Sequence, residues 1–127
     1  MKSVAGIDVG DKKGFHIAVL DTDNKQFSSI FHVTDIDDIT KQLKKLDGIY
    51  MVVAIDSPPR ATIRGPKTRA AERELHKRGY RIQWTPRNSV KASGWMMNGE
   101  KLWVSLRKNL PETLIVETLP SAVSDGL

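Results

Sequence analysis

The sequence predicts an α/β domain with a central mixed sheet, in which three antiparallel N-terminal strands precede parallel strands and helices flank the sheet. Three apolar runs support this: residues 4–9, 51–56 and 114–117 each carry an acidic residue at or near the C-terminal end. An uninterrupted apolar run bounded by a turn signal is typical of a buried strand. A helical pattern precedes the second run, and a strand–helix–strand passage normally makes its second strand parallel to its partner.

The length and composition indicate one domain. A chain of 127 residues is long enough for a single hydrophobic core. Because the sequence has no cysteine, disulfides and thiolate metal sites are excluded, and we expect a reducing, cytoplasmic setting. No apolar run approaches the roughly 18 residues of a membrane span, so we expect no membrane partner.

The N-terminal third predicts a hairpin and one further strand. A polar, glycine-bounded turn at 10–14 follows the first strand, and apolar residues 15–20 return as the second. Residues 26–33 form a third antiparallel strand. His16 and His32 lie in these strands, and we interpret both as ordinary strand residues.

A helix is expected between the third and fourth strands. Thr34 or Asp35 can cap its N-terminus, and Gly48 ends it. Its apolar residues follow helical spacing: Ile36, Ile39, Leu43 and Leu46. The fourth strand, 51–56, then stops at Pro58 and Pro59, which cannot continue it.

The second half of the chain predicts two more helices. The first covers 67–78 and closes at Gly79, the usual residue after a helix. A short strand is expected at 80–84. The second helix starts at Asn98 as its cap and ends near 109–111, and the last strand covers 114–117. Trp95 and Trp103 are expected in the core.

Charge is unevenly distributed along the chain. Residues 1–56 hold seven Lys and Arg against nine Asp and Glu, whereas residues 57–127 hold thirteen against six. Ten of the basic residues lie between Arg60 and Lys91, with only Glu72 and Glu74 opposing them. A basic segment beside clustered acids is typical of a polyanion held near a metal site, although a basic solvated surface gives the same pattern.

One basic row is spaced for a helix face. Arg69, Arg73 and Lys77 are four residues apart, so they lie along one side of the expected helix. Glu74 is placed to pair with Arg78. The row is either a solvated face or a track for phosphates.

Several short motifs follow one another along the chain: residues 6–8 (GID), 54–58 (AIDSP), 69–75 (RAAEREL) with Gly79, 94–96 (GWM), 99–102 (GEKL) and 116–122 (VETLPSA). In this order they resemble the predicted ribonuclease H-like nucleases, a domain-of-unknown-function family of the ribonuclease H-like superfamily. The resemblance covers nearly the whole chain. It implies a ribonuclease H-like fold for 1–127, and it also implies a C-terminal helical segment that we expect this sequence to lack.

The resemblance further implies a nuclease site that binds a divalent metal. Carried over by position, Asp8, Asp56 and Glu117 are the catalytic and metal-binding acids. Glu72 stands where the family often has aspartate, and it is a further candidate metal ligand. The basic residues expected to hold the nucleic acid are Arg60, Arg64, Arg69, Arg73 and Lys77.

The expected chemistry is hydrolysis of phosphodiester bonds in DNA or RNA. Mg²⁺ or Mn²⁺ prefers oxygen ligands, which strand-end carboxylates supply. Two such ions clamp the attacking and leaving oxygens. Two alternatives stay open. Residues 8–10 followed by a hairpin also suit an actin-like ATP-binding phosphotransferase, and a catalytically inactive nucleic-acid-binding module has the same charge pattern.

Overall fold

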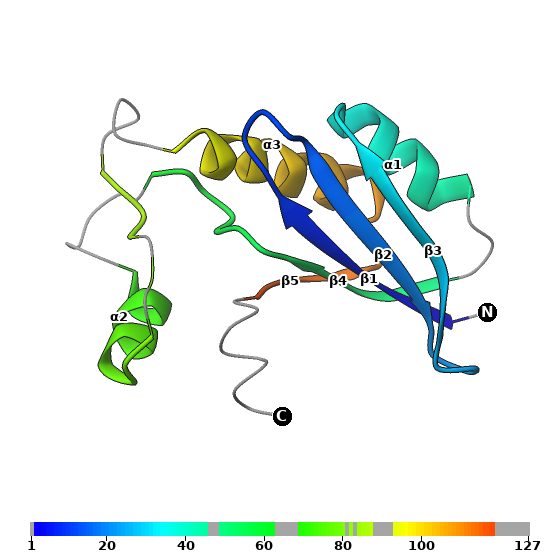
Figure 1. Ribbon diagram of the computed structural model, residues 1–127, viewed down its shortest axis with the longest axis horizontal. Coiled ribbons are helices and arrows are strands. Elements are labelled where there is room, and N and C mark those ends of the chain that lie inside the picture. Colours follow the sequence, from blue (N-terminus) through cyan, green and yellow to red (C-terminus); the bar gives the residue numbers. More distant parts are fainter. Residues whose placement is uncertain are drawn as a thin grey trace.

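The computed structural model describes residues 2–45, 49–62, 69–80, 82, 84–87 and 93–118. Its centre is a five-stranded sheet in the order β3-β2-β1-β4-β5 (Figure 1). The strands are β1 (Lys2–Val9), β2 (Phe15–Asp21), β3 (Gln26–Val33), β4 (Ile49–Ile55) and β5 (Leu114–Glu117). Each of these five strands was predicted from the sequence, and each observed end lies within two residues of the predicted one.

The sheet is mixed, as predicted. β2 runs antiparallel to both β1 and β3, whereas β4 is parallel to both β1 and β5. The C-terminal ends of β1, β4 and β5 consequently meet at one edge of the sheet. In open α/β sheets, ligands bind outside this edge.

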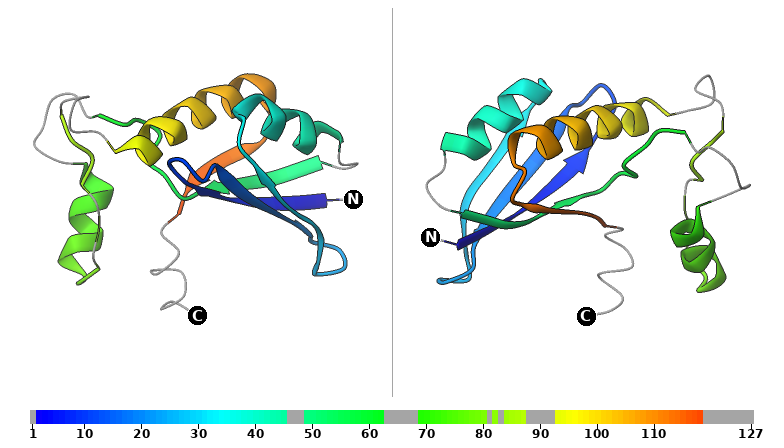
Figure 2. Two further views of the ribbon diagram at one scale, coloured as in Figure 1. Left: turned by 45° about the horizontal axis from the view of Figure 1, so that its top comes forward. Right: turned by 180° about the vertical axis from the view of Figure 1, so that it is seen from behind.

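Two helices cover one face of the sheet. These are α1 (Ile36–Lys45) and α3 (Gly94–Asn109), which lie side by side on the same face (Figure 2). The core forms between them and the strands, from Ile7, Ile17, Val19, Val53, Ile55, Ile39, Leu43, Leu102 and Leu106. Each of these side chains is at most 3% exposed. The third described helix, α2 (Ala70–Lys77), stands apart from this layer (Figure 1).

The opposite face of the sheet is apolar and, among the described residues, uncovered by any helix. Strand pairing places Ile30, Ala18, Gly6, Ala54 and Val116 in one row across it. Phe27, Leu20, Val4, Val52 and Leu114 form the next row. The large side chains at the edges, Phe27, Ile30 and Leu114, are more than half exposed.

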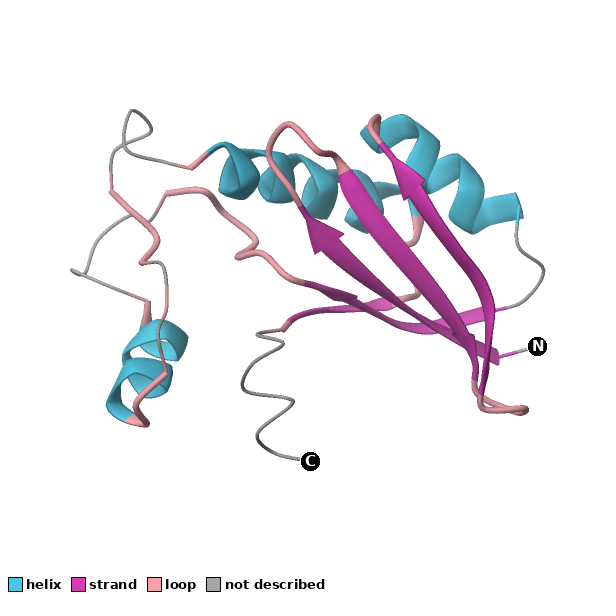
Figure 3. Cartoon of the chain, in the orientation of Figure 1, coloured by secondary structure: helices cyan, strands magenta, loops and turns pink. Residues whose placement is uncertain are grey.

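Two predictions from the second half of the chain were wrong. α3 begins at Gly94 with Ser93 as its N-cap, five residues before the expected cap at Asn98. Asn98 does not cap it, because its side chain bonds to the β1–β2 turn instead. The strand expected at 80–84 is absent at the residues described there, and Tyr80, Ile82 and Trp84 lie in a loop (Figure 3).

The other two helices are present, but α2 begins at Ala70, because Arg69 has an extended backbone and is its N-cap. The expected end of α1 at Gly48, its apolar residue Leu46 and the expected start of α2 at Lys67 lie outside the described residues. Asp35 Oδ1 accepts the backbone N–H of Asp37 at 2.9 Å, which caps α1 as expected. Gly79 follows α2 with φ of +90°, the left-handed conformation that glycine adopts most easily. Trp103 is buried in the core, and Trp95 packs against it. None of the described helices combines the length and apolar character that crossing a membrane requires.

Candidate active site

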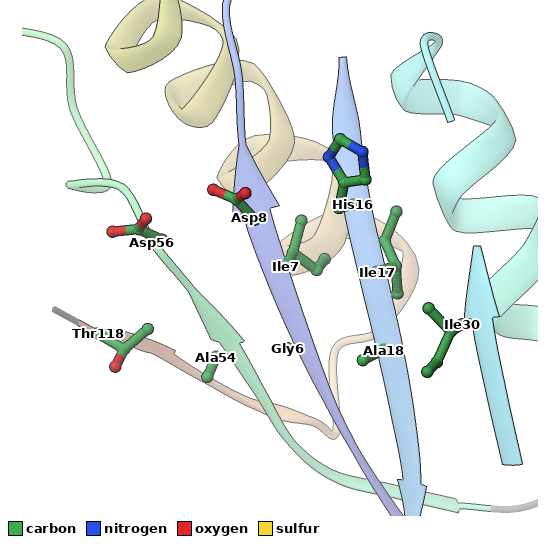
Figure 4. Close-up of a pocket in the computed structure, with 10 residues that line it drawn as sticks. All are labelled: Gly6, Ile7, Asp8, His16, Ile17, Ala18, Ile30, Ala54, Asp56 and Thr118. Carbon is green, nitrogen blue, oxygen red and sulfur yellow. The ribbon is translucent and has the colours of Figure 1, made fainter. Parts of the chain in front are cut away.

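Asp8 and Asp56 lie beside each other at the C-terminal ends of the two central strands. Ile7 pairs with Ile55, and the N–H of Asp56 donates to the carbonyl of Ile7 at 3.1 Å. Each aspartate comes one residue after this pair. Because side chains alternate along a strand, both carboxylates project from the same face of the sheet, the one opposite α1 and α3 (Figure 4).

Burial and the neighbouring acids together change the titration of Asp56. Burial, then the negative charges of Asp8 and Glu117, raises the pKa of Asp56 from 3.8 to about 6. All three causes disfavour the ionised form. A bound cation or proton would therefore be stabilised at Asp56.

Helix α3 fixes the loop that follows Asp56. Trp103 Nε1 donates to the carbonyl of Ser57 at 3.0 Å, and Glu100 Oε2 accepts the N–H of Ala61 at 2.7 Å. The helix also approaches this loop closely at Gly99, where an added Cβ would lie 1.7 Å from Ser57 Oγ. The position of Asp56 thus depends on three residues of one helix.

The same helix holds the turn that follows Asp8. The side-chain amide of Asn98 donates to the carbonyls of Gly10 and Asp11, both at 3.0 Å. α3 therefore supports both carboxylates from behind the sheet.

Glu117 is arranged differently from the two aspartates. It pairs with Ile55, one residue before Asp56, so strand alternation directs it away from the face that carries Asp8 and Asp56. Its carboxylate accepts two hydrogen bonds from Arg69, one from Nη1 at 3.2 Å and a shorter one from Nη2. The structure thus brings Asp8 and Asp56 together and holds Glu117 in an ion pair beside them.

Arg69 links Glu117 to Glu72. It also donates from Nη1 to Glu72 Oε2 at 2.7 Å. Burial lowers the pKa of Arg69, but its bonds to Glu117 and Glu72 outweigh burial and raise the pKa above the ordinary value. Arg69 therefore stays charged and is committed to these two acids.

Glu72 has a full set of protein partners. It is 6% exposed, Oε1 accepts the N–H of Thr85 at 2.7 Å, and Oε2 accepts the Thr85 hydroxyl at 2.6 Å. With Arg69 as a third donor, the carboxylate ties α2 to the loop at 84–87. Glu72 therefore positions α2 and this loop relative to each other.

The other residues expected to bind nucleic acid are exposed to solvent where the structure describes them. Arg60, Arg73 and Lys77 are exposed, Arg73 and Lys77 on α2. Arg64 lies outside the described residues. Arg69 does not belong to the expected row of exposed cations, because it precedes α2 as its N-cap and is engaged by two acids.

Sequence reasoning missed two residues beside the carboxylates. His16 pairs with Asp8 across β1 and β2, and Thr118 follows β5 on the outer side of Asp56. Both line an open pocket of about 630 Å³ together with Asp8, Asp56 and the apolar floor (Figure 4). The His16 ring also lies 4.6 Å from that of His32. The register of the predicted hairpin was the signal that could have placed His16 opposite Asp8.

The donor set suits a hard divalent cation. Within the described ranges, no group of three or more His, Asp or Glu residues is placed to hold a metal ion. The Asp8–Asp56 pair alone, however, offers carboxylate oxygens whose mutual repulsion a cation would relieve. Mg²⁺ is commonly bound by one or two carboxylates, with waters and substrate phosphates as its other ligands. The two aspartates therefore fit Mg²⁺ or Mn²⁺.

Comparisons of the chain with protein-family models, with curated proteins and with solved structures found no match.

Proposed function

We propose that this chain is a ribonuclease H-like, divalent-metal-dependent nuclease that hydrolyses phosphodiester bonds. The observation that carries the proposal is the Asp8–Asp56 pair at the C-terminal ends of the central parallel strands, with the pKa of Asp56 raised to about 6. Perturbed carboxylates in a pocket at this edge of a sheet are typical of functional sites. The strand order and directions support the fold assignment.

Asp8 and Asp56 are the residues that would hold the cation. When bound, Mg²⁺ or Mn²⁺ supplies Lewis acidity and neutralises charge on the phosphate. Asp8 is exposed and Asp56 is partly buried on the open face, so a nucleic-acid strand can reach them without displacing α1 or α3 (Figure 4). Glu117 adds negative charge next to Asp56 and increases the attraction for the cation.

The basic residues bind and orient the substrate in this proposal. The exposed side chains of Arg60, Arg73 and Lys77 neutralise backbone phosphates. Arg69 acts indirectly, because its bonds to Glu117 and Glu72 fix α2 against the end of β5. Glu72 has the same positioning role in place of metal binding.

The test is cleavage of a panel of labelled single-stranded and duplex DNA and RNA. Wild type is expected to cut at least one substrate with Mg²⁺ or Mn²⁺ and to stop in EDTA. Asp56→Asn should lower the rate about 100-fold or more, because metal activation contributes several kcal/mol to the transition state. Glu112→Gln, which changes an exposed acid in the turn before β5, is the matched control and should keep the wild-type rate.

Two results would overturn the proposal. One is the absence of metal-dependent cleavage of every substrate while nucleic acid still binds, which indicates an inactive binding module. The other is hydrolysis of ATP in place of nucleic acid, which favours the actin-like phosphotransferase.

A further inference from the structure

Trp84 is an exposed aromatic residue beside the basic helix α2. It is 37% exposed, and its ring lies 5.3 Å from that of His76, tilted by 59°. His76 is on α2, three residues after Arg73 and one before Lys77. Residues three and four apart share one helix face, so Arg73, His76 and Lys77 form a basic face at whose edge Trp84 lies.

The position of Trp84 is fixed by buried hydrogen bonds. Its neighbour Thr85 donates from both its N–H and its hydroxyl to the carboxylate of Glu72. Glu72 is buried and also accepts from Arg69, which holds Glu117 at the end of β5. The loop that carries Trp84 is thereby tied to α2, and α2 is tied to the strand next to the one that ends at Asp56.

This chain of contacts connects the surface to the carboxylate pair. Arg69, at the N-terminus of α2, contacts Glu117, whereas His76 contacts Trp84 about 10 Å further along the helix axis, from the rise of 1.5 Å per residue. A strand bound at Asp8 and Asp56 that follows α2 therefore passes Arg73 first and then meets Trp84 at the level of His76 and Lys77.

We infer that Trp84 is a stacking platform for an unpaired base of the nucleic acid, with Arg73 and Lys77 neutralising the adjoining phosphates. The inference rests on the nuclease proposed above and specifies its substrate as one with a single-stranded segment. Proteins that bind single strands combine basic grooves with aromatic side chains on which bases stack, largely without regard to sequence. In a duplex the bases are stacked on each other inside the helix, so Trp84 would contribute little to duplex binding.

The test measures affinity by fluorescence anisotropy in EDTA, which prevents metal-dependent cleavage. The probes are a labelled 12-nucleotide oligothymidylate and a labelled 12-base-pair DNA duplex. Trp84→Ala should weaken binding of the single strand about tenfold or more, the effect that loss of one stacked base gives, and leave duplex affinity within about twofold. Val104→Ala, which shortens an exposed apolar side chain of α3 on the other face of the sheet, should leave both affinities unchanged.

A second variant keeps the test informative if Trp84→Ala does not fold. Trp84→Phe retains an aromatic ring and should bind the single strand within about threefold of wild type. Binding should quench the tryptophan fluorescence of wild type but not of Trp84→Phe, because Trp103 is buried and Trp95 is partly buried.

Two outcomes overturn the inference, and they differ in what they say about the nuclease. Wild-type affinity for the single strand in Trp84→Ala, or equal quenching in wild type and Trp84→Phe, refutes the platform and leaves the nuclease standing. No binding of either probe by wild type removes the nucleic-acid partner, and the nuclease proposal fails with it.

Discussion

Asp56 has the most perturbed carboxylate among the described residues, and its titration has a consequence for stability. Its pKa is 3.8 as an ordinary side chain and about 6 in the fold. Between these values the folded protein keeps a proton that the unfolded chain has released. The free energy of unfolding should therefore fall as pH rises from about 4 to about 6 in the absence of metal.

The size of this effect is limited by solvent, because Asp56 is only partly buried. After screening we expect a loss of about 1 kcal/mol, well below the full conversion of the shift. Asp56→Asn should remove that loss, since asparagine does not titrate. Urea unfolding of wild type, Asp56→Asn and Glu112→Gln in EDTA at several pH values checks this. A wild-type free energy that rises through the same pH range would contradict it.

The residue scale is also where sequence reasoning reached its limit. Asp8 and Asp56 were predictable, because each follows an apolar run that fixes its strand and its end of the sheet. The ion pair between Arg69 and Glu117 was not predictable. These residues are 48 positions apart, and no local sequence pattern links them. Spacing alone assigned Arg69 to a row of exposed cations.

At the element scale, α3 is the helix that positions the site, and its approach at Gly99 is close. A Cβ at this position would meet Ser57 Oγ at 1.7 Å, whereas a Cβ at Gly6 on β1 would have nothing within 4 Å. Gly99→Ala should therefore cost about 1–3 kcal/mol, the usual penalty of overpacking. Gly6→Ala is the matched control and should change stability by less than about 0.5 kcal/mol.

Urea unfolding of the two variants measures the difference. A stable Gly99→Ala protein would mean that the loop at Ser57 moves away easily, and α3 would then not fix Asp56. A large loss for Gly6→Ala would mean that something packs against the floor of the pocket.

The elements that were predicted well are those whose pattern is local. Each strand of the sheet is a run of apolar or alternating residues between turn signals, and α1 has regular apolar spacing with a capping aspartate. α3 was placed too late, because residues 94–97 have no clear period and Asn98, the expected cap, bonds to the distant β1–β2 turn. Which face of the sheet a helix covers also depends on long-range contacts, and the spacing of apolar residues along the helix does not reveal these.

On the scale of the whole molecule, the two faces of the sheet differ in burial. Ile17 and Ile30 are matched residues on neighbouring strands: Ile17 faces the helices and is 1% exposed, and Ile30 faces the other way and is 72% exposed. Ile17→Ala should cost about 2–5 kcal/mol of stability. Ile30→Ala should cost less than about 1 kcal/mol, because little apolar surface leaves water at this position on folding.

Thermal or urea unfolding of both variants tests this asymmetry. Equal losses would show that the apolar face bearing Phe27, Ile30 and Leu114 is covered in solution. In that case the approach of nucleic acid over the open face, on which the proposed function depends, would be blocked.

The proposed function requires that Asp8 and Asp56 together bind a divalent cation, and the melting temperature with and without Mn²⁺ measures this binding. A cation that binds only the folded state at about 100 times its Kd stabilises that state by about 2.7 kcal/mol. We therefore expect Mn²⁺ to raise the melting temperature of wild type and Glu112→Gln by several degrees and to leave Asp8→Asn and Asp56→Asn nearly unchanged. A wild-type melting temperature indifferent to Mn²⁺, or an equal rise in all four proteins, would contradict the account.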